Sequence, residues 1–225
     1  MDYWEQKTVS MYRANWLISI LLIYFTACTT VDKLSPLPYY NSPDFNPLFI
    51  TANQAKKQIT HRIKKINVFD QHAELITTNR LQGKIHIANF FFTRCAIICP
   101  PMMQNLKEVV SKFNSDSSII FLSYSVTPWS DSVSILKKYA KENNFNFNNW
   151  HLCTGNTASI YTLARRYYFA EEALGYSKDS TSFLHTEHVL LIDRKLRIRG
   201  IYNASLRLEM EQLAKDIYTL KNEFL

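Results

Sequence analysis

Apolar positions in residues 63–222 fall into two kinds of pattern, which predict strands alternating with helices. Two runs, 85–92 and 118–126, are apolar almost throughout, as is typical of strands that are buried on both faces of a sheet. Shorter runs of alternating apolar residues predict further strands. The complete set of expected strands is 63–69, 73–77, 85–92, 118–126, 150–154, 188–193 and 196–202, with the first and last pairs forming β-hairpins.

Apolar residues at helical spacing predict four helices between and after these strands. Pro100 and Pro101 suit the first turn of the first helix, because proline lacks the N–H that is unpaired there. Asp131 or Ser130 is expected to cap the second helix, and Ser205 the last. The expected inward residues are Met102, Leu106, Val109 and Phe113 in the first helix, Val133, Leu136 and Ala140 in the second, Ile160, Leu163, Ala164 and Tyr167 in the third (157–168), and Leu206, Met210, Leu213, Ile217 and Leu220 in the fourth.

The order of these elements predicts an α/β fold, in which helices flank a mixed sheet. It is similar to the order of the thioredoxin fold with an N-terminal β-hairpin extension. The chain has 225 residues, of which 47% are hydrophobic, so it can build one substantial core. It contains no internal repeat, and we therefore expect a single domain over residues 63–225.

Residues 1–28 have a different composition from the rest. Lys7 and Arg13 precede an uncharged apolar run that ends at Cys28, and this run is too short for a comfortable membrane span. Such a pattern is typical of a secretory signal, whether the chain starts at Met1 or Met11. Residues 25–28 resemble a bacterial lipobox, in which a signal peptidase cuts before the cysteine and a diacylglyceryl group is attached to its sulfur. An uncleaved anchor helix is the alternative, and both predict a domain outside the cytoplasm.

The expected organisation is a lipoprotein signal peptide at 1–28, a proline-rich tether or wrapped arm at 29–62, and the thioredoxin-like domain at 63–225. A lipid on Cys28 would hold the protein at the cell membrane, with the domain facing the periplasm or extracytoplasmic space. Each buried acyl methylene contributes about 0.8 kcal/mol to such an anchor.

The formal charge of +7 permits an acidic partner, an anionic lipid or nucleic acid. The basic residues are scattered, however, and the densest short groups are 61–65, 165–166 and 194–199. Because these groups are interleaved with apolar positions of strands and helices, we interpret them as solvated surface. No nucleic-acid partner is expected.

Two thiols, Cys95 and Cys99, follow the first buried strand directly and precede a helix. Reactive groups gather at this position in α/β sheets. The helix N-terminus and Arg94 favour the thiolate, which is both a nucleophile and a soft metal ligand. This pair alone does not distinguish redox chemistry from metal binding or a structural disulfide. Cys153, in a short buried strand, is interpreted as a core residue.

A histidine near the other end of the domain narrows the choice. His185 lies just before a predicted central strand, at the edge where the cysteine loop should emerge. Two sulfurs and an imidazole suit Cu(I), whereas zinc would normally require a fourth ligand. His188 is the competing ligand, but it begins the strand. Met102 is assigned to the core, and four histidines are interpreted as ordinary polar residues: His61, His72, His86 and His151.

Four segments spread over residues 85–202 carry a specific resemblance. They read FFFTRCAIICP, SVTPWSDSVSILKKYA, HLCTGNTASIYTLARRYYF and HTEHVLLIDRKLRIRGIY. In this order the chain resembles the Sco family, also called SenC or PrrC. The resemblance implies copper ligation by Cys95, Cys99 and His185, the last lying eight residues before the acidic residue that ends the strand, Asp193. It implies Cu(I) and also Cu(II) as the bound ion.

Three positions depart from the family pattern. Ala96 and Ile97 stand where members often carry Pro and Asp, which affects the redox tuning of the thiols. Leu196 occupies a turn that usually contains Gly. Glu187 and Asp193 could orient ligands, although Asp193 is expected chiefly to begin a turn.

The resemblance implies a metallochaperone that delivers copper to the binuclear site of cytochrome c oxidase, with the copper-site subunit or another exported copper or thiol protein as partner. The alternative is a membrane-anchored thiol-disulfide oxidoreductase with Cys95 and Cys99 as its catalytic redox pair, which needs no histidine. A third interpretation is an inert lipoprotein with a permanent disulfide.

Overall fold

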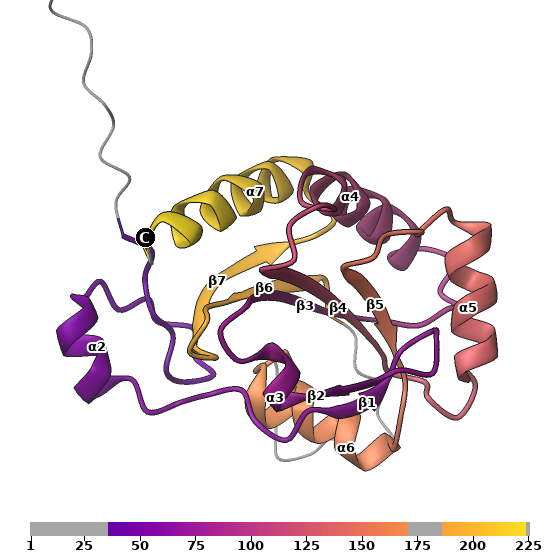
Figure 1. Ribbon diagram of the computed structural model, residues 1–225, viewed down its shortest axis with the longest axis horizontal. Helices are drawn as coiled ribbons and strands as arrows, with labels where there is room; N and C mark the ends of the chain where they lie inside the picture. The colour runs from indigo at the N-terminus through magenta and orange to yellow at the C-terminus, as the bar shows by residue number, and fades with distance from the viewer. Residues whose placement is uncertain (1–35, 171–185, 224–225) are drawn as a thin grey trace, which may run out of the picture. The chain divides into compact units, whose positions relative to one another are not determined.

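Five strands form the central sheet, in the spatial order β5-β4-β3-β6-β7 (Figure 1). β3, β4 and β5 are parallel, whereas β6 runs antiparallel to both of its neighbours. The strands are β3 (Ile85–Phe91), β4 (Ile119–Ser125), β5 (Trp150–Cys153), β6 (His188–Ile192) and β7 (Ile198–Asn203). This computed structural model describes residues 36–170 and 186–223. The mixed α/β sheet expected from the sequence is confirmed.

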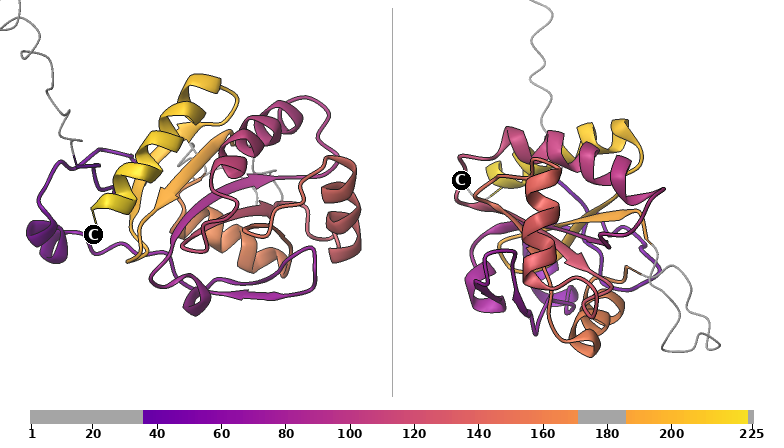
Figure 2. Two further views of the ribbon diagram at one scale, coloured as in Figure 1. Left: turned by 45° about the horizontal axis from the view of Figure 1, so that its top comes forward. Right: turned by 90° about the vertical axis from the view of Figure 1, so that its right-hand side faces the viewer.

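Helices cover the sheet on both faces, as Figure 2 shows. On one face α4 and α7 pack against the strands, and α5 closes the edge at β5. On the other face lie α6 and a separate two-stranded hairpin, β1 with β2, followed by α3. The elements are β1 (Asn67–Phe69), β2 (Leu75–Thr77), α3 (Thr78–Leu81), α4 (Cys99–Lys112), α5 (Val133–Glu142), α6 (Thr157–Thr162) and α7 (Arg207–Asn222). The N-terminal hairpin is thus confirmed, with shorter strands than expected.

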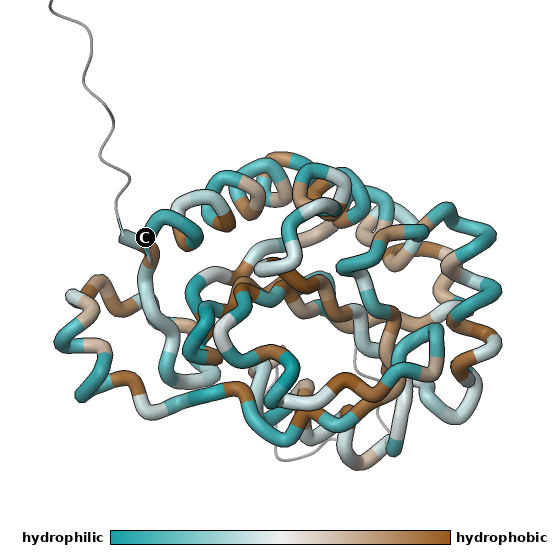
Figure 3. Tube along the Cα trace, viewed as in Figure 1, coloured by the Kyte–Doolittle hydropathy of each residue, from teal (hydrophilic) through white to brown (hydrophobic). Residues whose placement is uncertain are grey.

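The apolar core lies on both faces of β3 and β4, all of whose residues are buried. Figure 3 shows the hydropathy of each residue along these strands. A polar chain lies within the core on the side of α4 and α7: Trp150 Nε1 donates to Ser123 Oγ at 2.8 Å, and Ser123 Oγ donates to Asn89 Oδ1 at 2.6 Å. Since a buried polar group is costly without a partner, these side chains fix one another's orientation as well as filling space. Cys153 is fully buried in the second face, as predicted.

Two predicted helix caps are wrong. Ser132, and neither Ser130 nor Asp131, caps α5 by accepting the N–H of Ile135. The carboxylate of Asp131 instead takes hydrogen bonds from hydroxyl groups in the core. At α7 the residue before the helix is Leu206, without a side-chain cap, so Ser205 does not cap it.

The third helix is not regular. After α6, residues Leu163–Tyr167 form a π-helical turn, in which Tyr168 N–H donates to Leu163 O at 2.9 Å. A π-turn adds one residue to the helical turn, so the inward position moves from Tyr167 to Tyr168. Tyr168 is fully buried, and its hydroxyl lies 3.1 Å from His86 Nε2 and from Tyr124 Oη. His86 is therefore a core residue, contrary to its interpretation as an ordinary polar one.

Residues from Pro36 onward form one compact unit that includes the arm before the hairpin. Tyr39 pairs with Leu48, and the backbone N–H of Tyr40 donates to Ile198 O at the edge of β7. Helix α2 (Ala52–Gln58) begins with a capping box at Thr51 and buries Ala55. Among residues 36–170 and 186–223, no helix is long and apolar enough to cross a membrane.

Candidate metal and thiol site

The two thiols lie where β3 ends and α4 begins. The backbone turns sharply after Phe92, whose carbonyl accepts the N–H of Cys95 at 3.3 Å. Cys99 is the first residue of α4, and its N–H donates to Cys95 Sγ at 3.3 Å. Pro100 and Pro101 follow in the first turn, where their missing N–H groups leave no helical hydrogen bond unmade. The helix entrance therefore directs a backbone donor at the sulfur of Cys95.

A cavity of about 300 Å³ opens over these thiols. Its walls come from the ends of β3 and β4, the cysteine loop and the start of β6 with the end of β7. The lining residues are Phe90, Phe91, Phe92, Cys95, Ile98, Cys99, Val126, Thr186, Glu187, His188 and Asn203. The topology thus brings a late segment of the chain to the cysteines, as predicted from the strand order.

The two thiols differ in burial and in acidity. Cys95 is half-buried; this burial opposes ionisation, but hydrogen bonds from the backbone N–H groups of Cys99, Ile97 and Ile98 outweigh it and lower the pKa of Cys95. Cys99 is buried, and burial raises its pKa to about 12, with further contributions from Cys95 and from the buried Asp131. Cys95 is therefore the thiol that ionises first and that an incoming group can reach.

Asp131 ties the cysteine loop to the neighbouring loop after β4. Its fully buried carboxylate accepts hydrogen bonds from Thr93 Oγ1 at 2.6 Å, Ser125 Oγ at 2.5 Å and Thr127 Oγ1 at 3.0 Å, and from the backbone N–H of Thr93 at 3.1 Å. These bonds replace the water that a carboxylate needs. Because Thr93 stands two residues before Cys95, Asp131 holds the start of the cysteine loop in place.

The structure brings together some of the predicted site residues, and others lie outside the described residues. Cys95 and Cys99 share one cavity. His185 and the lipidation residue Cys28 fall outside the described residues. Thr186, which follows His185 in the sequence, lines the cavity, and so does His188. Within residues 36–170 and 186–223, no three His, Cys, Asp or Glu side chains are arranged to hold a metal ion.

Residues considered as secondary candidates are distributed between the core, the cavity and the far end of the sheet. Met102 and its neighbour Met103, both in α4, are fully buried, so Met102 is a core residue as predicted. Glu187 lines the cavity. Asp193 begins the β6–β7 turn, as expected, at the sheet end opposite the cysteines.

Besides His86, sequence reasoning missed two further buried polar groups, Asp131 and His151. The sequence predicts Asp131 only as a helix cap, because a lone Asp before a helix fits that role. His151 was interpreted as an ordinary polar residue, but its Nδ1 lies 2.8 Å from Oδ2 of the fully buried Asp70. Burial lowers the pKa of His151 more than Asp70 raises it. Alternation within β5 offers a signal, since it places His151 on the same face as Cys153, which is expected to lie in the core.

The fold, together with the dithiol between β3 and α4, defines a protein of the thioredoxin-like class. Comparison with family models then identifies the branch: the SCO1/SenC model matches residues 54–222. The chain belongs to the SCO1/SenC family. This finding confirms the resemblance that the four sequence segments carry.

Individual relatives agree with this assignment. The chain is 29% identical over 116 residues to the SCO1 protein homolog of Bacillus subtilis, a match that covers 50% of this chain and 60% of that protein. The SCO2-like protein RP587 of Rickettsia prowazekii is 27% identical over 161 residues, covering 69% of this chain and 74% of the relative.

Solved structures show the same fold. BsSco, described as a member of the Sco family of cytochrome c oxidase assembly proteins with a disulfide switch, superposes with a TM-score of 0.61 at 22% identity, covering 72% of this chain and 94% of that one. Bradyrhizobium japonicum ScoI, solved with copper bound, gives a TM-score of 0.54 at 23% identity, covering 69% and 96%. At these identities the likeness establishes the thioredoxin-like fold.

Proposed function

We propose that this chain is a lipid-anchored copper metallochaperone outside the cytoplasm, which binds one Cu(I) through Cys95, Cys99 and His185 and delivers it to the copper site of cytochrome c oxidase. The carrying observation is the shared cavity: both thiols line it, and so does Thr186, the neighbour of His185 in sequence. Membership of the SCO1/SenC family and a copper-bound ScoI structure support the same function.

The donor set suits transport of the ion. Two thiolates and an imidazole are soft donors that favour Cu(I), and a set of three leaves room for a ligand from an acceptor. Cys95 is half-buried whereas Cys99 is buried, so an acceptor ligand would replace Cys95 first. Copper is the cargo in this scheme, and it leaves with the acceptor.

An anaerobic Cu(I) titration of the reduced chain against a chromophoric competitor tests the proposed binding. We expect one ion per chain, and at least a 100-fold loss of affinity in Cys95→Ser, Cys99→Ser and His185→Ala. His188→Ala and Cys153→Ser are the matched controls, because each replaces the same type of donor without removing a proposed ligand. Unchanged affinity in the first three variants would refute the proposal, and a loss in His188→Ala with none in His185→Ala would reassign the third ligand.

The anchor and location have a separate test. Lipidation of Cys28 predicts a diacylglyceryl-modified N-terminus, which mass spectrometry of the protein from membranes would detect. Cys28→Ser should abolish this modification together with the cleavage before residue 28, so the recovered chain should carry the intact signal segment and no lipid. Recovery of unprocessed chain in the cytoplasm would contradict both the anchor and the export.

A thiol-disulfide oxidoreductase is the second candidate, favoured by the unequal pKa values of the two thiols. The Cys95 thiolate would attack a partner disulfide, forming a mixed disulfide and releasing one partner thiolate. Cys99, after losing its proton, would attack Cys95 Sγ and release the second partner thiol, so two electrons pass to the partner. An exported thiol reductant must then reduce the Cys95–Cys99 bond. Retained oxidase assembly in His185→Ala cells, together with loss in either cysteine variant, would favour this function over copper delivery.

A further inference from the structure

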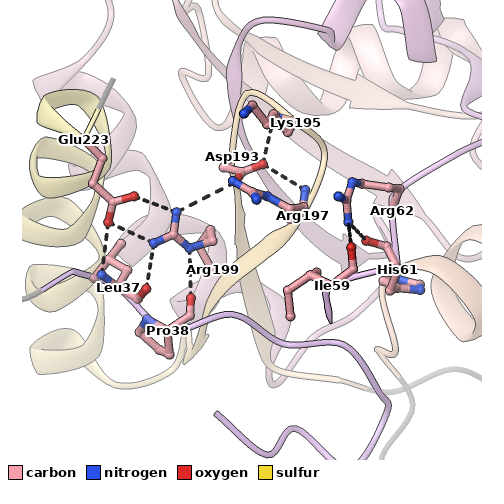
Figure 4. A network of polar contacts seen from close by, with 10 residues as sticks. All are labelled: Leu37, Pro38, Ile59, His61, Arg62, Asp193, Lys195, Arg197, Arg199 and Glu223. Atoms are coloured by element: carbon pink, nitrogen blue, oxygen red, sulfur yellow. Dashed lines mark hydrogen bonds and ion pairs between the residues drawn. The ribbon is translucent and has the colours of Figure 1, made fainter. Parts of the chain in front are cut away.

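We propose that Arg199 and Glu223 form a clamp that fastens the N-terminal arm to the end of the sheet opposite the cysteines and thereby sets how far the anchored domain can move. The clamp consists of Arg199, Glu223 and the arm residues Leu37 and Pro38, which Figure 4 shows, together with the arm residue Tyr39. Its consequence for reach rests on the proposed anchor at Cys28, whereas the clamp itself does not.

The buried guanidinium of Arg199 donates hydrogen bonds both to Glu223, after the C-terminal helix, and to the N-terminal arm. Arg199 Nη1 and Nη2 donate to the two carboxylate oxygens of Glu223 at 2.7 and 2.8 Å. Its Nη2 also donates to Leu37 O at 2.6 Å, and its Nε to Pro38 O at 2.9 Å. The backbone N–H of Leu37 donates to Glu223 Oε1 at 3.1 Å.

Because the Arg199 guanidinium is buried, its contacts with Glu223 and with the arm depend on one another. The side chain of Arg199 is only 1% exposed, so its charge must be paired and hydrogen-bonded within the protein. The guanidinium of Arg199 also lies 4.0 Å from the centroid of the Tyr39 ring, and that of Arg197 lies 4.6 Å from it. Detaching the arm would leave Arg199 without two carbonyl acceptors and without its aromatic contact.

The position of Glu223 supports a dedicated ion pair. It directly follows the last residue of α7, where a negative charge is unfavourable because the helix C-terminus already carries partial negative charge. The bidentate contact with Arg199 compensates for that position. The C-terminal helix is thus coupled to the arm through one side chain.

The register of the sheet places this clamp far from the thiols. β7 runs parallel to β3, so Arg199, near the start of β7, lies at the opposite end from Cys95. Asn203, at the other end of β7, lines the thiol cavity, about 13 Å further along the strand at ~3.3 Å per residue. The arm therefore joins the domain at the end away from the cavity.

This placement sets how many residues lie between the proposed anchor at Cys28 and the clamp. With the arm clamped, only residues 29–35 separate Cys28 from Pro36, and they span at most about 25 Å when fully extended. With the arm released as far as residue 62, the tether would span at most about 120 Å. The clamp thus keeps the domain close to the membrane, with the thiol cavity at the end away from the attachment point.

Hydrogen–deuterium exchange of the full chain in detergent tests the clamp. In Arg199→Lys we expect the amides of Tyr39, Tyr40 and Leu48 to exchange at least 10-fold faster, with a smaller increase in Glu223→Gln. Amides in the middle of β3 and β4 should not change, and Cu(I) affinity should stay as in the unchanged chain. Glu211→Gln, which removes an exposed ion pair with Arg207 on the same helix, is the matched control.

Equal protection of the arm in all variants would overturn the clamp. A general loss of protection in Arg199→Lys would show unfolding, in which case Glu223→Gln decides, since Glu223 is partly exposed at the helix end.

Energy transfer from a dye on Cys95 to acceptor lipids tests the reach, with the lipidated chain in phosphatidylethanolamine and phosphatidylglycerol vesicles. We expect a narrow distance distribution, which broadens in Glu223→Gln. A distribution as broad in the unchanged chain would overturn the restricted reach. A chain that does not bind vesicles refutes the anchor, while the exchange experiment still decides the clamp.

Discussion

At the end of the sheet where β3 stops, the backbone forms a loop around two free thiols, and Ile97 is 82% exposed. At the opposite end, charged side chains are buried: Arg197 pairs with Asp193 and Arg199 with Glu223. The first end has a cavity and accessible surface, whereas the second has a closed network. The free thiols and the buried ion pairs therefore lie at opposite ends of the same sheet.

A single carboxylate provides the exception at the open end. Asp131 has no cationic partner among its hydrogen-bond donors, which are hydroxyls and one backbone N–H. It therefore supports the cysteine loop without placing a positive side chain next to the thiols. We expect the two ends to respond differently to substitution and to pH, and the following experiments test that difference in order of expected effect.

The largest effect is expected from His86, at the closed end of β3. Burial lowers its pKa to about 3, whereas the unfolded chain titrates near 6.5. The folded state thus disfavours protonation of His86. The contribution of the neutral imidazole to the free energy of unfolding is complete above pH 6.5 and is lost as the pH decreases towards 3. The loss approaches ~1.4 kcal/mol per pH unit and is on the order of 5 kcal/mol at pH 3.

Urea denaturation between pH 7 and 4 measures this slope. His86→Phe should flatten the dependence of stability on pH relative to the unchanged chain. Parallel curves for His86→Phe and the unchanged chain would contradict a neutral buried imidazole.

Asp131→Ala should destabilise the open end by about 3 kcal/mol, because it leaves Ser125, Thr127 and Thr93 without their acceptor. Chemical denaturation measures the loss, and amide exchange at Cys95 should accelerate with it. Asp44→Ala, which removes an exposed carboxylate, should leave the stability nearly unchanged. A similar loss in both variants would mean that Asp131 has no special role.

The two thiols should differ in reactivity. At pH 7 we expect iodoacetamide to modify Cys95 at least 10-fold faster than Cys99, because Cys95 has the lowered pKa and the more accessible sulfur. Peptide mass spectrometry of the reduced chain gives both rates, with the fully buried Cys153 as an internal reference. Equal rates for Cys95 and Cys99 would show that the loop opens freely.

The smallest effect is expected in the turn at the closed end. Leu196 has a φ of 61°, in the left-handed region where a Cβ costs about 1–2 kcal/mol. Both Leu196→Ala and Leu196→Gly lose the buried side chain, but Leu196→Gly also relieves the strain. Leu196→Gly should therefore be more stable than Leu196→Ala by about 1 kcal/mol, the reverse of the usual order. Thermal denaturation compares the two, and a more stable Ala variant would contradict the strain.

The pattern of apolar residues determined the strands and their order along the chain. The positions of the cysteines and of the two prolines after them determined the dithiol at the start of α4. These features follow from local rules, because a continuous apolar run must be buried on both faces and two prolines can begin a helix. The pattern did not determine which side chains fill the gaps between elements. Asp131 bonds to Thr93 and Ser125, and His86 meets Tyr168, only because separate segments pack side by side.

Tertiary structure alone decided the π-turn and the clamp. The π-turn moves Tyr168 into the core where helical spacing predicted Tyr167, because the residue must fit against β3 and β4. The clamp joins residues 37 and 223, whose contact no local pattern encodes. Residue types and spacing thus determine which chemistry the chain carries, and long-range packing determines which groups are buried, paired and left accessible.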